Sequence, residues 1–132
     1  MIIVDTSVLI DAFHGNPTWE DWSLTALEQA AAQDQLVIND IIYAELAPGY
    51  SQMGELDRVL ASTDVKSAPL PKLALFLAGQ AFRMYRRRGG PRTTLLPDFL
   101  IGAHAMVEDW PLLTRDPDRV RAYFPTVTLI AP

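Results

Sequence analysis

The stretch IIVDTSVLID, residues 2–11, decides the fold of this chain. Its β-branched run at residues 2–4 is typical of a short buried strand, and Asp5 follows directly. Residues 6–13 then favour a short helix, which Gly15-Asn16-Pro17 interrupts. The opening is therefore a strand that passes straight into a helix, with an aspartate at the carboxyl end of the strand.

The same alternation continues to the end of the chain. Further strands are predicted at residues 36–38, 65–70, 112–114 and 127–130. Helices are predicted at residues 18–32, across Tyr43 to Leu46, and at 52–62, 72–88, 98–107 and 117–123. Alternating strands and helices predict an α/β fold, a three-layer α/β/α sandwich with a mostly parallel central sheet. A chain of 132 residues without a linker or repeat is expected to form one domain, residues 1–132.

Composition narrows the class of protein. Hydrophobic residues make up 49% of the chain and charged residues 20%, as in globular proteins. The chain has no cysteine, which removes disulfides, thiol catalysis and cysteine-bound zinc, and is compatible with a cytoplasmic location. We expect no signal peptide, because the first residues lack basic side chains, and no membrane span.

Charge is distributed unevenly. The net charge is -5, yet all 11 Lys and Arg residues fall between Arg58 and Arg121. One short arginine run contains Arg83, Arg86, Arg87, Arg88 and Arg92. Two interpretations stay open: the run binds phosphates, or it is a solvated helix end favoured by the helix dipole.

Four acidic residues form the first functional hypothesis: Asp5, Glu45, Asp98 and Asp116. Asp5 and Asp116 follow apolar runs near strand ends, and the carboxyl ends of parallel strands form the crevice where ligands bind. Glu45 and Asp98 lie in apolar helical segments, where a carboxylate is costly to bury without a cation or another partner. The four together predict a divalent metal site.

The segments around these acids resemble the PIN-domain ribonucleases. IIVDTSVLID is similar to the family's opening motif, and a helix bearing Glu45 follows at a suitable distance. LLPDFLIGAHA around Asp98 and LLTRDPDRVRAYFPTVTLIAP at the C-terminus continue the match over essentially the whole chain. The order Asp, Glu, Asp, Asp resembles the VapC toxins of toxin–antitoxin pairs.

This resemblance implies a PIN-like sandwich that cuts RNA with Mg²⁺ or Mn²⁺ at Asp5, Glu45, Asp98 and Asp116. It also implies that Thr6, Ser7 and Thr114 help to arrange the site. The implied partners are an RNA substrate, a cognate antitoxin protein that holds the toxin inactive, and a second copy in a homodimer. Operator DNA would be bound only indirectly, through the antitoxin.

The chemistry assigns a role to each of these residues. Asp5 and Asp98 are expected to bind the metal most directly, and Glu45 to bind metal or orient the attacking water. Asp116 completes the set, with Asp118 as its replacement, and Arg115 is expected to meet a substrate phosphate. Without metal, mutual repulsion should raise some of the carboxyl pKa values.

Each acid also has a structural explanation. Asp5 could cap the following helix, Asp98 and Asp116 suit helix N-termini, and Glu45 could face solvent. We expect Asp11, Asp40 and Asp118 to be solvated or capping residues, and His104 to be structural.

Two other functions remain open alternatives. One is a non-catalytic PIN-like binding or regulatory module. The other is an aspartyl-phosphate phosphatase that uses Asp5 as nucleophile, although the second aspartate of the Asp-x-Asp motif is replaced by Ser7.

Overall fold

A five-stranded sheet forms the centre of the structure, a computed structural model that describes residues 1–132. The strands are β1 (Ile2–Val4), β2 (Leu36–Ile38), β3 (Val65–Ser67), β4 (Leu112–Leu113) and β5 (Leu129–Ile130). They lie in the order β3-β2-β1-β4-β5, and every neighbouring pair is parallel. The predicted α/β class with a parallel sheet is confirmed.

Helices connect the strands. They are α1 (Thr6–His14), α2 (Glu20–Gln33), α3 (Asp40–Leu46), a 3₁₀ turn η1 (Ala47–Gly49), α4 (Met53–Ser62), α5 (Lys72–Arg87), α6 (Pro97–Glu108) and α7 (Asp118–Tyr123). No helix is both long and apolar enough to cross a membrane.

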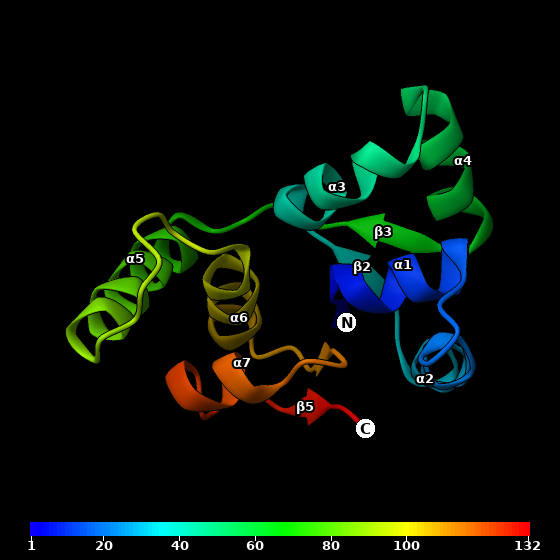
Figure 1. The fold of residues 1–132 in the computed structure, drawn as a ribbon. Helices are drawn as coiled ribbons and strands as arrows, with labels where there is room; N and C mark the ends of the chain where they lie inside the picture. The colour runs from blue at the N-terminus through cyan, green and yellow to red at the C-terminus, as the bar shows by residue number, and fades with distance from the viewer.

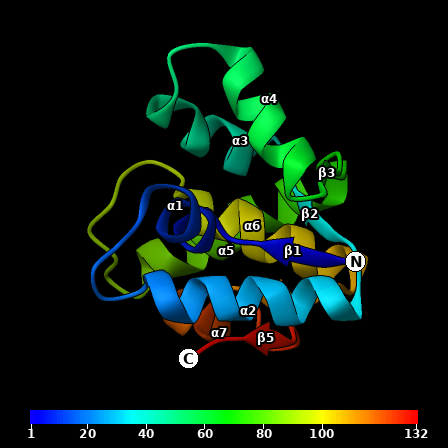
Figure 2. The same ribbon diagram turned by 90° about the vertical axis from the view of Figure 1, so that its right-hand side faces the viewer.

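The helices lie on both faces of the sheet. Figure 1 shows α5, α6 and α7 on one side and α1, α2 and α4 on the other, and Figure 2, viewed from the side of the second group, shows β1 between α2 and α4. Helix α3 follows β2 and contacts both α1 and α6, so it lies across the edge where the sheet's strands end. This arrangement is the expected three-layer sandwich.

The core explains why the short strands hold together. Strands β1, β2 and β4 are buried along their whole length, as expected for central strands covered on both faces. The fully buried ring of Phe99 on α6 packs against the rings of Phe82, Tyr85 and Tyr123, which joins α5, α6 and α7. Buried apolar area of this kind is the main stabilising contribution to the fold.

Several element boundaries differ from the prediction by one to three residues, and two of these differences have a clear local cause. The strand expected at residues 65–70 ends at Ser67, because Pro69 and Pro71 have no backbone N–H to continue the ladder. The helix expected from Thr18 begins at Glu20, because the Asn16 side chain accepts hydrogen bonds from the backbone N–H groups of Thr18 and Trp19 and holds both in the preceding turn.

Candidate active site

Asp5 stands at the carboxyl end of β1 and caps α1. Its backbone is extended, with φ -65° and ψ 149°, and its Oδ1 accepts a 2.8 Å hydrogen bond from the Thr6 backbone N–H. Its Oδ2 accepts a 2.7 Å hydrogen bond from Thr114 Oγ1. Thr114 can reach it because β4 pairs with β1, in the register Val4 with Leu113, so both residues follow directly at the same sheet edge. The expected capping role of Asp5 is confirmed, and Thr114 fixes the second oxygen of the same carboxylate at the sheet edge.

Glu45 reaches the same edge from α3. Thr6 Oγ1 donates a 2.7 Å hydrogen bond to Glu45 Oε1, so Thr6 connects the Asp5 and Glu45 carboxylates. Helix α3 is placed by Asn39, whose side-chain Oδ1 accepts from the Ile42 backbone N–H 3.0 Å away. Glu45 is half-buried and therefore does not project freely into solvent.

Asp98 approaches from the opposite layer, in the first turn of α6. Its Oδ2 accepts a 3.0 Å hydrogen bond from Arg119 Nη1, an ion pair that bridges α6 and α7. The negative charge of Asp98 nevertheless acts on Asp5, because it raises the pKa of the Asp5 carboxyl. The three acids Asp5, Glu45 and Asp98 therefore share one electrostatic environment.

The Asp5 carboxyl has a raised pKa. Burial, with smaller contributions from the charges of Asp98 and Glu45, raises it from 3.8 to about 6. The hydrogen bonds from Thr114 and Thr6 oppose this effect by stabilising the carboxylate. The predicted rise in carboxyl pKa is confirmed for Asp5, although burial contributes more than repulsion.

Asp116 is held by its backbone and not by its side chain. Its backbone N–H donates a 3.0 Å hydrogen bond to Thr114 Oγ1, and its side chain is 69% exposed. The Asp118 side chain is fully exposed and lies 3.7 Å from Arg121, as expected of a solvated residue. Asp116, unlike Asp118, is therefore linked to Asp5, because both bond to the Thr114 hydroxyl.

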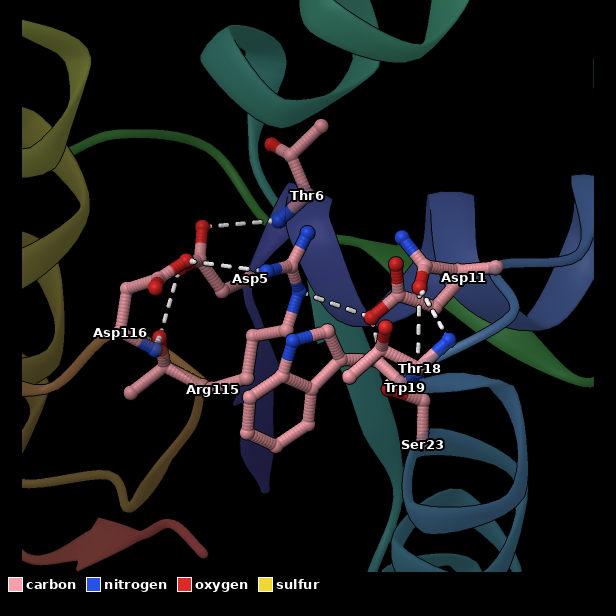
Figure 3. Close-up of polar contacts among 10 residues, drawn as sticks. Asp5, Thr6, Asp11, Thr18, Trp19, Ser23, Arg115 and Asp116 are labelled. Carbon is pink, nitrogen blue, oxygen red and sulfur yellow. Dashed lines mark hydrogen bonds and ion pairs between the residues drawn. The ribbon is translucent and has the colours of Figure 1, made fainter.

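Arg115 and Asp11 form a contact that the sequence did not predict. Figure 3 shows Arg115 extending between Asp116 and Asp11. Its Nε lies 2.8 Å from Asp11 Oδ2, though the N–H is too poorly aligned for a hydrogen bond, and its Nη1 lies 3.9 Å from Asp116 Oδ2. Its guanidinium also stacks over Trp19, at 5.6 Å. These contacts occupy Arg115 within the protein, whereas the sequence suggested a substrate phosphate as its partner.

The expectation that Asp11 is solvated or capping was wrong. Asp11 is completely buried, and its Oδ2 also accepts a 2.9 Å hydrogen bond from Ser23 Oγ on α2. A buried carboxylate requires such partners. The available signal was its position in the apolar run VLIDAF on α1, where only one face can reach solvent. Asp40, in contrast, is exposed in the first turn of α3, as expected.

His104 is structural, as predicted. It is fully buried, and burial lowers the pKa of its imidazole. Its Nδ1 lies 3.1 Å from the side-chain amide of Asn39, the residue that caps α3. His104 thus ties α6 to α3, the helices that carry Asp98 and Glu45.

The arginine run is partly used to end α5. Arg86 Nη1 donates to the carbonyl oxygens of Gly90 and Arg92, at 2.9 Å and 3.0 Å, and closes the loop after the helix. Arg88 stacks on the Tyr123 ring at 5.1 Å. For these two side chains the helix-end interpretation is supported over phosphate binding.

The donor set suits a hard divalent cation. The candidate ligands at this edge are carboxylate and hydroxyl oxygens, and Mg²⁺ prefers oxygen ligands; Ser7 Oγ is buried without a hydrogen-bond partner. However, no three acidic side chains converge on one point that could hold an ion. Thr6 and Arg119 hold Glu45 and Asp98, respectively, so a cation would have to draw these carboxylates inward.

Comparison with known proteins identifies the family. The PIN-domain family model matches residues 2–125, and the chain therefore belongs to the PIN-domain family. No curated protein sequence matches significantly.

Solved structures share the fold. The chain is similar to a chain of VapBC2 from Rickettsia felis bound to a promoter DNA fragment, with a TM-score of 0.72 and 20% identity over 99% of this chain and 98% of the other. VapBC-1 from nontypeable Haemophilus influenzae gives the same values. DNA-bound VapBC from Salmonella typhimurium gives a TM-score of 0.71 and 16% identity, over 98% and 96%. At these identities the likeness establishes the fold.

Proposed function

We propose that this protein is a Mg²⁺- or Mn²⁺-dependent endoribonuclease that acts as the toxin of a toxin–antitoxin pair. The observation that carries the proposal is Asp5: a half-buried carboxylate with a pKa of about 6, held by Thr6 and Thr114 and facing the charges of Asp98 and Glu45. Such a group is destabilised until a proton or a cation neutralises it.

Each residue at the sheet edge then has a part in phosphodiester hydrolysis. A bound divalent cation would supply an activated water and would stabilise charge on the phosphate oxygens. Asp5 and Asp98 would hold it, and Glu45 would hold it or orient the water. Thr6 and Thr114 keep the Asp5 carboxylate oriented, and Asp116, whose backbone N–H bonds to Thr114, would complete the acidic set.

The antitoxin is the proposed protein partner. The solved relatives are VapBC assemblies, two of them bound to DNA, which supports a partner that carries the DNA-binding function. An apolar pocket of about 340 Å³ between α1 and α2 suits the apolar face of such a partner; it is lined by residues that include Phe13, Leu24 and Leu27. Leu24 is 41% exposed, so part of this apolar surface is accessible to a partner.

A homodimer is proposed on similar grounds. Three large apolar side chains near the start of α5 are exposed: Leu73 at 56%, Leu75 at 45% and Phe76 at 64%. A second copy of the chain that buried them would remove this apolar area from water. Sedimentation of the antitoxin-free protein over a range of concentrations measures the oligomeric state.

The phosphatase alternative finds no support in the geometry. Lys66 and Lys72 are the only lysines. Lys66 lies on β3, separated from β1 by β2, and pairs with Asp64 at 3.9 Å. The motif position two residues after Asp5 is a serine, Ser7, and Lys66 is not placed beside Asp5 for phosphoryl transfer.

A cleavage assay tests the proposed function. Purified antitoxin-free protein is incubated with total RNA from its host and Mg²⁺ or Mn²⁺, and the new RNA ends are sequenced. We expect discrete metal-dependent cuts, loss of cutting in Asp5→Asn and Asp98→Asn, and retained cutting in the surface control Asp118→Asn. A wild-type protein that cuts no RNA and whose melting temperature does not respond to metal would support the non-catalytic alternative instead.

A further inference from the structure

Arg119 is the arginine that lies directly against a proposed metal ligand. It belongs to the first turn of α7, and its Nη1 donates a 3.0 Å hydrogen bond to Asp98 Oδ2. Its guanidinium carbon Cζ lies 5.6 Å from the Tyr85 ring centroid and 5.9 Å from that of Phe99, within the range of cation–π contacts. The aromatic rings therefore help to hold the guanidinium beside Asp98.

The neighbouring arginines are placed differently. Arg115 is committed to the buried Asp11, and only 23% of its side chain is exposed. Arg121 is 61% exposed and lies 3.7 Å from Asp118 on the surface. Arg115 also lies 3.9 Å from the exposed Asp116, but it is anchored to a buried carboxylate, whereas the acid that Arg119 contacts, Asp98, is partly exposed.

The Arg119–Asp98 pair is suited to exchange. Its side chains are 36% and 46% exposed, and pairs with that much contact with water contribute little stability. A guanidinium carries five N–H donors, and Arg119 uses one of them in a hydrogen bond within the protein. The pair also lines an open pocket of about 280 Å³, together with Arg115, Asp116, Pro117 and Asp118.

A divalent cation on Asp98 would change this arrangement. The cation and the guanidinium would compete for the same carboxylate and would repel each other at short range. A phosphate, by contrast, accepts the paired N–H groups of an arginine in a bidentate contact, which is stronger than a neutral hydrogen bond. The release of Arg119 from Asp98 therefore provides a phosphate-binding group beside the metal.

We infer that Arg119 is a substrate-binding residue of the proposed nuclease: it occupies Asp98 in the metal-free protein and transfers to an RNA phosphate when the cation binds. This inference rests on the proposed function. It assigns to Arg119 the role that the sequence suggested for Arg115.

The test compares Arg119→Met, Arg119→Lys and the matched control Arg121→Met. Methionine keeps an unbranched apolar side chain but removes the guanidinium and its charge. Mn²⁺ affinity is measured by calorimetry on antitoxin-free protein without RNA, and kcat/KM is then measured on total host RNA at saturating Mn²⁺.

The two readouts should move in opposite directions. Arg119→Met should bind Mn²⁺ several-fold more tightly, because Asp98 is released, and should lose about tenfold or more in kcat/KM, because a charge-assisted phosphate contact is lost. Arg119→Lys should bind Mn²⁺ much as wild type does and should recover part of kcat/KM. Arg121→Met should match wild type in both.

The outcomes separate this inference from the proposed function. If Arg119→Met binds Mn²⁺ no more tightly than Arg121→Met while wild type cuts RNA, the nuclease stands and the inference is overturned. Loss of both Mn²⁺ affinity and cleavage would assign Arg119 a merely structural role and would also overturn it. If wild type neither binds Mn²⁺ nor cuts RNA, the proposed function fails and the inference fails with it.

Discussion

Thr114 Oγ1 donates a 2.7 Å hydrogen bond to Asp5 Oδ2, joining two residues that are 109 positions apart in the chain. The same Oγ1 accepts from the Asp116 backbone N–H at 3.0 Å. One threonine therefore orients the carboxylate after β1 and positions the acid that follows β4. Both contacts depend on β1 and β4 being neighbours in the sheet.

The stability of the metal-free protein should depend on Asp5 in a characteristic way. The unfolded carboxyl ionises near pH 4 and the folded one near pH 6, since burial raises its folded pKa to about 6. Below pH 4 the Asp5 carboxyl is protonated in both the folded and the unfolded protein, so its raised pKa costs no stability. The cost grows between pH 4 and 6, where only the unfolded state ionises freely, and reaches about 3 kcal/mol above that range.

Asp5→Asn removes this cost, although its amide accepts one hydrogen bond fewer, a loss of about 1 kcal/mol. We expect the variant to be more stable than wild type by about 2 kcal/mol at pH 8 and slightly less stable below pH 4. Urea unfolding at both pH values measures the difference. A difference that did not change with pH would show that Asp5 titrates normally.

Metal affinity should depend on pH through the same group. A cation competes with the proton on Asp5, so Mn²⁺ binding should tighten about tenfold per pH unit below pH 6 and level off above it. Calorimetry in buffers of different ionisation enthalpy would detect the released proton. Affinity that is constant from pH 5 to 7 would argue against Asp5 as a ligand.

The contact between Asp11 and Arg115 should contribute to the stability of the folded protein. Asp11→Ala removes a fully buried carboxylate that is bound to Arg115 and Ser23, and should destabilise the protein by about 3 kcal/mol. A double-mutant cycle with Arg115→Met would show coupling between the two residues. Asp118→Ala, which removes a fully exposed carboxylate, is the control and should change stability little. Equal effects of Asp11→Ala and Asp118→Ala would disprove the assignment.

Two glycines provide a matched test of the packing of α6 on α7. A Cβ on Gly102 would lie 2.6 Å from the Phe124 ring and 3.4 Å from Val120, so Gly102→Ala should destabilise by about 1–3 kcal/mol. Gly79 on α5 has no atom within 4 Å of such a Cβ. Gly79→Ala should therefore stabilise by about 0.5–1 kcal/mol, because alanine favours the helix. Thermal melts of both variants check these opposite signs, and a stable Gly102→Ala would indicate that α7 packs more loosely.

Local patterns in the sequence predicted the elements and the position of the acids. The apolar run before Asp5 and the helix start at Asp98 are set by a few neighbouring residues, so they can be recognised without knowledge of the tertiary structure. The parallel sheet also followed, because alternating strands and helices restrict the topology. Asp5, Glu45 and Asp98 lie at the expected edge for this reason, while their joint role in binding a metal remains a prediction.

The sequence by itself determined where strands, helices and acids occur, because backbone propensity and apolar periodicity are local properties. Only the tertiary structure decided which charges meet: Arg115 lies against the buried Asp11, and Arg119 lies against Asp98. Those pairings depend on strand order and helix packing across long stretches of chain. In the sequence Arg115 and Arg119 look alike, but the fold places Arg115 against a buried carboxylate and Arg119 at the exposed acidic edge.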